Sequence, residues 1–293
     1  MADDTALKGA WGVNSEYGRL NDVLLGPPDN FSWLPTSSIS KATLASGAAF
    51  DHQRAMRQHR EMVDAYRDAG VKVHFLEPDP ALKYQVYARD SNFMTPYGAV
   101  VTQMSQWWRR GEYAAVIRFY QDHDIPIFRM VTAGSMEGGD FDVIEPGCVL
   151  IGYCGERTQE VAARQLQGWF EGEGWEVRLA PIAEHYVHID LMVCMLAEKL
   201  CAVCLETTDQ AIVDWLKAKK IKIVPVSFQD TMRLGCNVMA LGNDRILSTS
   251  ESGDLNQKLR ALGFTVYDPE VTMFTLGGGG VHCMAQPLSR DPV

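Results

Sequence analysis

The sequence repeats one pattern at a nearly constant interval. Four segments consist of two apolar runs joined by a short turn, which is typical of a β-hairpin. They start 47 to 50 residues apart and span 93–103, 141–153, 191–205 and 238–249. A fixed period of this length predicts an array of similar modules. The alternative is an ordinary mixed α/β sheet in which the spacing is a coincidence.

Each predicted hairpin is followed by a helical pattern and then by a strand pattern. The helical segments carry apolar residues three and four positions apart, as a helix with one core-facing side requires. These segments are 108–124, 156–174, 207–220 and 252–263. The strands after them are 125–131, 175–182, 221–227 and 264–270. The repeating unit is therefore a hairpin, a helix and a strand.

A further, incomplete copy of this unit opens the chain. It has a strand at 20–26, a helix at 51–70 and a strand at 71–77, but it lacks a second hairpin strand. The apolar segment 281–288 can supply that strand and close a ring. We therefore predict five hairpin–helix–strand modules in one closed α/β domain that spans residues 1–293.

Polar residues stand directly before each hairpin, where an apolar core would not need them. They are Arg89-Asp90-Ser91-Asn92, Glu137-Gly138-Gly139-Asp140, His188-Ile189-Asp190, Cys236-Asn237 and His282-Cys283. Equivalent positions in a ring of modules lie near one axis, so we expect these side chains to converge. Acids, an imidazole and a thiol are rarely placed together unless chemistry requires it.

The composition limits which binding partners and which cellular compartment we expect for this protein. The net charge is −10 and no basic run occurs, which argues against a nucleic-acid surface. The most apolar stretch, 191–205, is interrupted by Glu198-Lys199, so no membrane span is expected. The first residues lack a basic-then-apolar leader, and the seven cysteines are an odd number lying mostly in apolar runs. These features predict a cytoplasmic protein.

Six stretches resemble, in the same order, motifs of the guanidino-group-modifying superfamily, the five-bladed α/β propellers called penteins. They are YARDSNF, MEGGDFDV, IGYCGERT, HIDLMVC, GCNVMALG and GGGGVHCMAQPL, and they cover nearly the whole chain. The superfamily includes arginine deiminases, agmatine deiminases, dimethylarginine dimethylaminohydrolases and amidinotransferases. The resemblance implies a pseudo-symmetric propeller of ββαβ modules and an enzyme that acts on C–N bonds in linear amidines.

The resemblance identifies Cys283 as the nucleophile. A free thiol is mostly protonated at neutral pH, so a guanidinium cation held nearby would be needed to stabilise the thiolate. The glycines 277–280 permit close backbone approach and a positive φ ahead of the thiol. No Gly-Lys-Ser/Thr follows them, so they do not form a phosphate loop. For the other six cysteines we expect small buried hydrophobes.

His188 is the predicted general acid and base. Its ordinary pKa, about 6.5, suits it to protonate a leaving amine and then to activate a water. We expect Asp190, two residues on, to share a strand face with it, and His185 to be an ordinary surface or core histidine. Glu137 is expected to orient the imidazole and to bond the substrate; the alternative is an exposed glutamate in a surface turn.

Asp90 and Asp190 are predicted to hold the guanidinium, because a carboxylate matches paired N–H donors in bidentate geometry. The alternative for Asp90 is an ion pair with Arg89. Arg157 matches the arginine that holds the substrate α-carboxylate in dimethylarginine hydrolases and arginine deiminases. Its alternative is a surface charge in the first turn of a helix, which is a slightly unfavourable place for a cation.

The roles of three further residues stay open. Arg109 and Arg110 are either carboxylate contacts or surface residues, and Asp140 is a candidate cap of its own turn. We expect no metal and no organic cofactor. The cysteine pair in CAVC, residues 201–204, would point to opposite faces of a strand. A zinc site of His185, His188 and Asp190 is disfavoured, because the resemblance already gives the last two other roles.

We predict a hydrolase that attacks a guanidinium carbon through Cys283, forms a covalent thiouronium, and releases an amine or ammonia with a ureido product such as citrulline. An amidinotransferase and a non-catalytic propeller binding protein are the alternatives. The chain is a mosaic. Arginine deiminases are longer and carry Asn where this chain has Tyr84. Dimethylarginine hydrolases have an acid in place of Arg89 and lack the Asp190 position, and amidinotransferases lack this form of EGGD. The substrate is a small guanidino cation, and a homo-oligomer is one option.

Overall fold

Five sheets of three strands each form the fold of residues 11–293, which are the residues that the computed structural model describes. The predicted lack of a leader at residues 1–10 lies outside them. The strands of the four complete modules are β3 (Asn92–Thr95), β4 (Gly98–Val101) and β5 (Ile127–Met130); β6 (Phe141–Glu145), β7 (Cys148–Tyr153) and β8 (Glu176–Pro181); β9 (Val193–Ala197), β10 (Leu200–Val203) and β11 (Lys222–Pro225); β12 (Met239–Gly242), β13 (Arg245–Leu247) and β14 (Thr265–Tyr267). In each sheet the hairpin strands are antiparallel and the third strand is parallel to the second.

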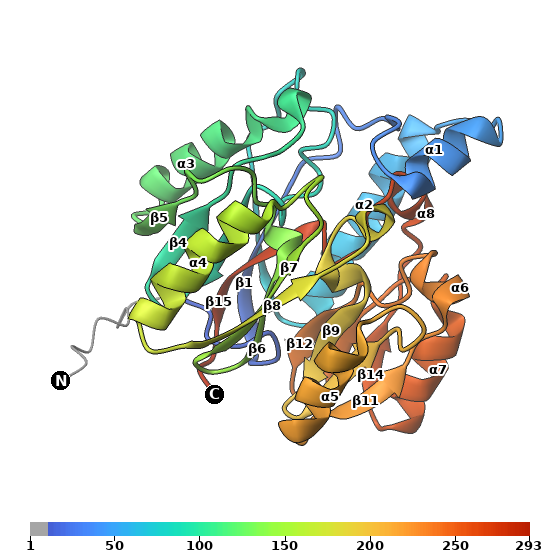
Figure 1. The fold of residues 1–293 in the computed structure, drawn as a ribbon. Helices are drawn as coiled ribbons and strands as arrows, with labels where there is room; N and C mark the ends of the chain where they lie inside the picture. The colour runs from blue at the N-terminus through green and yellow to red at the C-terminus, as the bar shows by residue number, and fades with distance from the viewer. Residues whose placement is uncertain (1–10) are drawn as a thin grey trace.

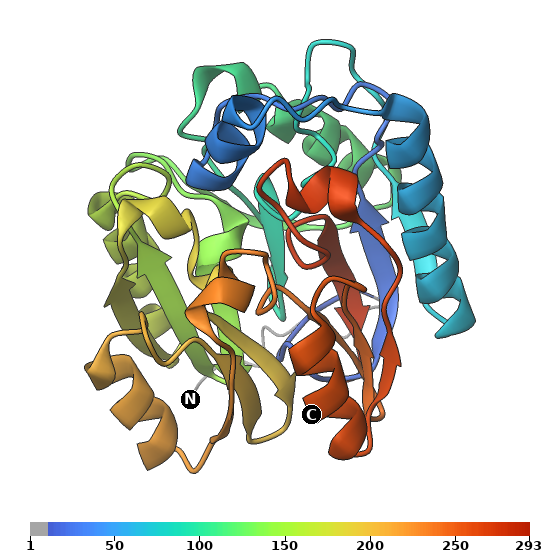
Figure 2. The ribbon, with the colours of Figure 1, turned by 90° about the vertical axis from the view of Figure 1, so that its right-hand side faces the viewer.

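The fifth sheet closes the ring as predicted. Strand β15 (Ala285–Arg290) pairs antiparallel with β1 (Leu20–Leu25), with Gln286 opposite Leu24. Strand β2 (Lys72–Phe75) pairs parallel with β1 on its other side. Figure 2 shows the red C-terminal strand beside the blue N-terminal one. The strand missing from the first module is therefore supplied from the far end of the chain.

One amphipathic helix of each module covers the outside of its sheet (Figure 1). These helices are α2 (His52–Asp68), α3 (Glu112–Asp122), α4 (Glu160–Gly172), α5 (Gln210–Ala218) and α7 (Gly253–Ala261). In α2 the side chain of Asp51 caps the first turn by accepting from the N–H of Arg54. Its buried Met62 and Tyr66 join the same core as Leu25 on β1. Each such side chain contributes about 1.5 to 3 kcal/mol by leaving water.

Three short helices and four 3₁₀ turns lie outside the predicted repeat. The helices are α1 (Ser38–Ala45), α6 (Phe228–Thr231) and α8 (Thr272–Thr275). The turns are η1 (Trp107–Arg109), η2 (Gly138–Asp140), η3 (Glu184–Tyr186) and η4 (Ile189–Leu191). The predicted strand face shared by His188 and Asp190 is therefore wrong, because η4 separates their directions before β9 begins at Val193.

The two ends of each sheet carry different parts of the hairpins. The polar segments that precede the hairpins lie at one end of the sheets, which we call the pocket end. The hairpin turns, such as Pro146-Gly147 and Glu198-Lys199, lie at the opposite end, which we call the bend end. No helix in the described part of the chain has both the length and the apolar character needed to cross a bilayer.

Candidate active site

A narrow pocket at the pocket end gathers residues from several modules. The centre of a water molecule can occupy about 20 Å³ of it. Asp90, Arg109, Arg157, His188 and Cys283 all line it, together with Gly277–Gly279. Of the six predicted site residues, the repeat placed five together, and three of these, Asp90, His188 and Cys283, line the pocket with Arg157, which the resemblance had supplied. Glu137 and Asp190 contact these residues from behind.

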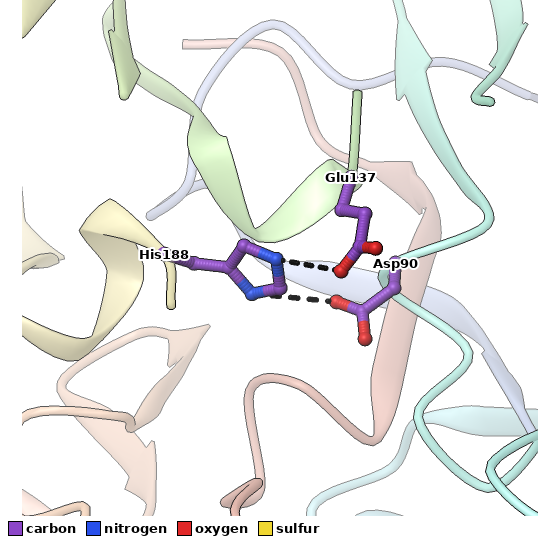
Figure 3. A group of neighbouring side chains, drawn as sticks. All are labelled: Asp90, Glu137 and His188. Atoms are coloured by element: carbon purple, nitrogen blue, oxygen red, sulfur yellow. Dashed lines mark hydrogen bonds and ion pairs between the residues drawn. The ribbon is translucent and has the colours of Figure 1, made fainter. Parts of the chain in front are cut away.

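His188 lies between two carboxylates. Its Nε2 is 2.9 Å from Glu137 Oε2 and its Nδ1 is 3.6 Å from Asp90 Oδ1 (Figure 3). Burial alone would lower the pKa of His188, but Asp90, Glu137 and Asp140 outweigh it and raise the pKa to about 10. The imidazole is therefore cationic at neutral pH and carries a proton to donate. The outside location of His185 agrees with its predicted ordinary role, since it is exposed.

Glu137 is fully buried, which rejects the alternative of an exposed turn residue. Burial favours its neutral form, yet Arg157 and His188 hold the pKa of its carboxyl well below the usual range. Arg157 Nη1 lies 2.9 Å from Glu137 Oε2, and its Nη2 donates to the carbonyl of Thr36 at 2.8 Å. Arg157 is buried, so it is not a surface charge on a helix.

Asp90 pairs with Arg109 rather than with Arg89. Arg109 Nη1 lies 2.6 Å from Asp90 Oδ2 and is buried on the 3₁₀ turn η1. Arg109 also forms a two-pronged pair with Glu112, at 2.7 and 2.8 Å. Arg89 instead donates from Nη2 to Glu16 Oε1 at 2.8 Å. Sequence patterns gave no sign that Arg109 would be buried, because it follows two tryptophans in a polar loop.

Arg110 and Asp140 have supporting positions. Arg110 does not line the pocket and donates to the backbone carbonyls of Met104 and Ser105. Asp140 Oδ1 accepts from the N–H of Ile189 at 2.8 Å. Asp140 therefore caps the neighbouring turn, which carries His188, rather than its own turn as we expected.

The turn that carries Cys283 is fixed by Asn237. Both backbone N–H groups of His282 and Cys283 donate to Asn237 Oδ1, each at 3.2 Å. A Cβ at Gly280 would lie 2.6 Å from the same oxygen, so only glycine fits there. The positive φ predicted ahead of the thiol is confirmed at Gly278, where φ is 102°.

The Cys283 thiol is buried beside Asp190, whose Oδ2 lies 3.7 Å from Sγ. Burial raises the pKa of this thiol well above its ordinary value, and Asp190 and Asp90 raise it further. These surroundings favour the protonated thiol at neutral pH. Of the other six cysteines, which we expected to be buried, only Cys154 is partly exposed.

Asp190 forms its hydrogen bond with His282 and not with His188, which directly precedes the turn η4. Its Oδ2 accepts a 2.8 Å hydrogen bond from Nδ1 of His282. Asn237 directly precedes the last of the four predicted hairpins, and His282 precedes the closing strand, but the sequence motifs do not indicate a role for either residue. Their equivalence to Asp90, Asp140 and Asp190 in the repeat was the signal that could have identified them.

One wall of the pocket comes from the segment that precedes α1, which the repeat did not predict. Thr36 and Ser37 line the pocket. The Tyr84 hydroxyl lies 3.0 Å from the backbone oxygen and nitrogen of Leu34 and 3.2 Å from the carbonyl of Gly277. Tyr84, which stands where arginine deiminases have Asn, therefore joins this wall to the glycine segment.

Asp90, Glu137 and His188 are the set best placed to hold a metal ion, with ligand atoms within 4.8 Å of one another. Both carboxylates, however, already contact arginine guanidiniums. A metal ion would compete with these fixed cations and with the imidazolium. The donor set therefore suits organic cations and ion pairs better than a divalent ion.

The free donors and acceptors of the site indicate its chemistry. Asp90 Oδ1 and Asp190 Oδ1 are buried and have no hydrogen-bond partner within residues 11–293. The N–H groups of the nucleophile's own turn are already bonded to Asn237, so they are not an oxyanion site. A thiol, a proton donor and unsatisfied carboxylate oxygens suit a cationic amidine carbon rather than an ester or amide carbonyl.

Solved structures with the same fold support the ring architecture. Dimethylarginine dimethylaminohydrolase from Pseudomonas aeruginosa, a cysteine-to-serine mutant in complex with citrulline, superposes with a TM-score of 0.77 at 19% identity, covering 92% of this chain and 99% of that one. The N-terminal domain of ArgZ, a cyanobacterial arginine dihydrolase bound to substrate, has a TM-score of 0.79 at 18% identity, covering 92% and 98%. The predicted pentein fold is confirmed.

Sequence comparisons agree. The uncharacterized protein YkgA of Bacillus subtilis is 26% identical over 278 residues, which cover 94% of each chain. The dimethylarginine dimethylaminohydrolase of Pseudomonas aeruginosa is 22% identical over 241 residues, covering 80% of this chain and 89% of that protein. A family model described as N,N dimethylarginine dimethylhydrolase, eukaryotic, matches residues 35–290. The chain therefore belongs to the N,N dimethylarginine dimethylhydrolase family.

Proposed function

We propose that this protein hydrolyses the guanidinium group of arginine or a related guanidino compound, with residues 11–293 acting as one catalytic domain. The observation that carries the proposal is the meeting of Cys283, the His188 imidazolium and two carboxylates with unsatisfied oxygens around one narrow pocket. The family is one of C–N hydrolases. The relatives include a protein named dimethylarginine dimethylaminohydrolase and another named arginine deiminase, from Rhodococcus erythropolis, which is 23% identical over 85% of this chain.

Binding of the cation prepares the nucleophile. Asp90 and Asp190 offer anionic oxygens to the guanidinium N–H groups, and the cation then offsets the negative charges that oppose ionisation of Cys283. The thiol loses its proton to solvent as the cation binds, so the thiolate is formed only beside its electrophile. Arg157 is the proposed contact for a substrate carboxylate, because its guanidinium lies in the wall of the pocket.

The chemistry then proceeds in two halves. The Cys283 sulfur forms a bond to the guanidinium carbon, and the tetrahedral adduct collapses as His188 donates its proton to the departing amine or ammonia. The sulfur-bound amidino group that remains is a thiouronium. His188, now neutral, takes a proton from water as the water oxygen bonds to the same carbon. Collapse of this second adduct breaks the carbon–sulfur bond; the adduct's hydroxyl proton returns to the leaving thiolate, and a ureido product such as citrulline is released.

The site uses only side chains of this chain in these steps, so we propose that no metal or organic cofactor takes part. We infer a cytoplasmic location from the seven cysteines, which are free thiols. The acidic charge is the basis for proposing a small-molecule partner rather than a nucleic acid.

A guanidine panel tests the function. Arginine, methylated arginines, agmatine and short guanidino acids would be incubated with and without glycine as an acceptor, and ureido product and released amine would be measured. We expect Cys283→Ala to reduce turnover at least about 10⁴-fold, because Cys283 supplies the only thiol among the residues that line the pocket. Cys148→Ala is the matched control, since Cys148 lies at the bend end of β7; it should keep full turnover.

The outcomes separate the candidate functions. A ureido product with a mass adduct on Cys283 supports hydrolysis. Product that forms only with an acceptor shows amidino transfer instead. Retained turnover in Cys283→Ala removes the thiol mechanism. If no substrate of the panel gives a product or an adduct, the result favours a propeller that only binds.

A further inference from the structure

The two carboxylates nearest the thiol are held in the same way. Asp90 gives one oxygen, Oδ2, to the guanidinium of Arg109 at 2.6 Å, and its Oδ1 has no hydrogen-bond partner among the described residues. Asp190 gives Oδ2 to His282 at 2.8 Å, and its Oδ1 likewise lacks a partner in that part of the chain. Each acid thus has one oxygen hydrogen-bonded to a buried basic side chain and one oxygen without a hydrogen bond, although Asp90 Oδ1 also forms an ion pair with His188 Nδ1 at 3.6 Å. His282 occupies for Asp190 the place that Arg109 occupies for Asp90.

The surroundings of His282 favour its charged form. Its Nδ1 faces Asp190, and its Nε2 lies 3.8 Å from Glu16 Oε2. Asp142 on β6 interacts with it as a further carboxyl, and Arg89 is the opposing cation. Burial and Arg89 lower the pKa of His282, but the hydrogen bonds to Asp190 and Glu16 raise it above its ordinary value on balance. His282 is buried and does not line the pocket, so it does not contact substrate.

Asp190 borders the place where the reacting carbon must sit. Its Oδ2 lies 3.7 Å from Cys283 Sγ, and an attacked carbon lies about 3 to 3.5 Å from the sulfur before the bond forms. A guanidinium in that position is within reach of the Asp190 carboxylate. A carboxylate buried without a cationic partner would instead take up a proton, because burial penalises its charge.

We propose that His282 is a positioning residue that holds Asp190 as a carboxylate anion beside the thiol, giving the cationic substrate a second anionic anchor. This rests on the proposed function for the class of substrate, a small guanidinium cation. His282 differs from Arg109 in one respect: arginine stays charged at all working pH values, whereas histidine titrates. The anchor at Asp190 is therefore the one that depends on pH.

The first test is the pH dependence of kcat/KM in His282→Ala, with His185→Asn as the control. Without its partner, the pKa of Asp190 should rise, because only His188 and Arg89 are then left to oppose the effect of burial, so kcat/KM falls about 10- to 100-fold, as for loss of a charge-assisted hydrogen bond. The loss in kcat/KM should shrink as pH rises and Asp190 ionises. The acid limb of the pH profile of His282→Ala should therefore lie at higher pH than that of the wild type, by about one pH unit or more. His282→Asn, which keeps an N–H donor near the position of Nδ1, should lose less. His185 is exposed, so its variant should match the wild type. A loss that is equal at every pH overturns the proposal.

The second test reads the anchor without turnover. Chloroacetamidine and chloroacetamide alkylate thiols and have almost the same shape, but only the amidine is a cation. Rates of labelling of Cys283, followed by intact mass, should strongly favour the amidine in the wild type. The amidine-to-amide ratio of labelling rates should fall at least about tenfold in His282→Ala. In His282→Asn part of the preference for the amidine should remain. An unchanged ratio in His282→Ala overturns the proposal, even when the guanidine panel gives product. A ratio that falls as expected in a protein that turns over no guanidine refutes the proposed function but keeps the role of His282.

Discussion

Glu137 lies just before the turn η2 that leads into β6, and Glu145 is the last residue of β6; both form ion pairs, yet their surroundings differ. Glu137, at the pocket end, is fully buried and contacts Arg157 and His188. Glu145, at the bend end, is partly exposed and contacts Lys199 and Lys219. A buried pair cannot exchange a lost partner for water, whereas a surface pair can. The pocket end therefore depends on each of its charges, and the bend end does not.

The largest expected difference comes from the matched pair Glu137→Gln and Glu145→Gln. Glu137→Gln leaves Arg157 buried without its counterion, so we expect the free energy of unfolding to fall by about 3 to 5 kcal/mol. Turnover should also fall, because His188 loses the carboxylate that orients it. Glu145→Gln should cost at most about 1 kcal/mol and leave turnover unchanged. Urea unfolding and the guanidine panel measure both. Equal losses in the two variants would remove the distinction between the two ends.

Two glycines on either side of β6 sharpen the same comparison. A Cβ at Gly139 would lie 2.6 Å from His188 Nδ1, so Gly139→Ala must displace the imidazole. A shift of about 1 Å in a reacting group lowers turnover by about 100-fold. Gly147, in the bend, has φ of 75° and open space around its Cβ position. Gly147→Ala should cost about 1 to 2 kcal/mol in unfolding free energy through backbone strain and keep full turnover. A Gly139→Ala protein with normal kcat would contradict the assigned position of His188.

The smallest expected effect is a pH dependence of stability that arises at the pocket end. His188 has a folded-state pKa of about 10, above its ordinary value, so its stabilising contribution is complete below about pH 6.5 and is lost as pH rises through 10. At the bend end the pKa of Lys219 is raised and those of Glu145 and Glu176 are lowered, so these pairs stay charged over the same range. We expect the free energy of unfolding to fall by about 1 kcal/mol or more between pH 6.5 and 9.5.

His188→Asn provides the control for that slope. The variant should be less stable at pH 6.5 and should lose less stability on going to pH 9.5. Lys219→Met should show the wild-type slope. Were the His188→Asn slope to equal that of the wild type, the pH dependence would come from other groups.

The sequence predicted the ring because its signals are periodic. Hairpin turns, helix stripes and the spacing of the modules all repeat, so an error in one copy is corrected by the others. The pocket residues were located by the same argument, since Asp90, Glu137, His188 and Cys283 occupy equivalent positions.

The directions of the side chains were harder to predict. His188 and Asp190 lie on either side of a 3₁₀ turn, and nothing in three consecutive residues distinguishes that turn from a strand. The burial of Arg109 depends on Asp90 and Glu112, which meet it only in three dimensions. The wall at Thr36 belongs to a segment outside the repeat. These features are set by contacts between modules, which a periodic pattern does not encode.

The closure of the ring has a consequence for the time at which the enzyme acquires its activity. Cys283 stands two residues before β15, and β15 reaches its place only by pairing with β1, which lies more than 250 residues earlier in the chain. A ribosome that has made the first four hairpins has therefore produced the acid, the base and the carboxylates, but no nucleophile. Such long-range pairing is also slow to form. A partly synthesised or truncated chain carries no assembled reactive thiol, so a guanidino compound meets the complete site only after folding has finished.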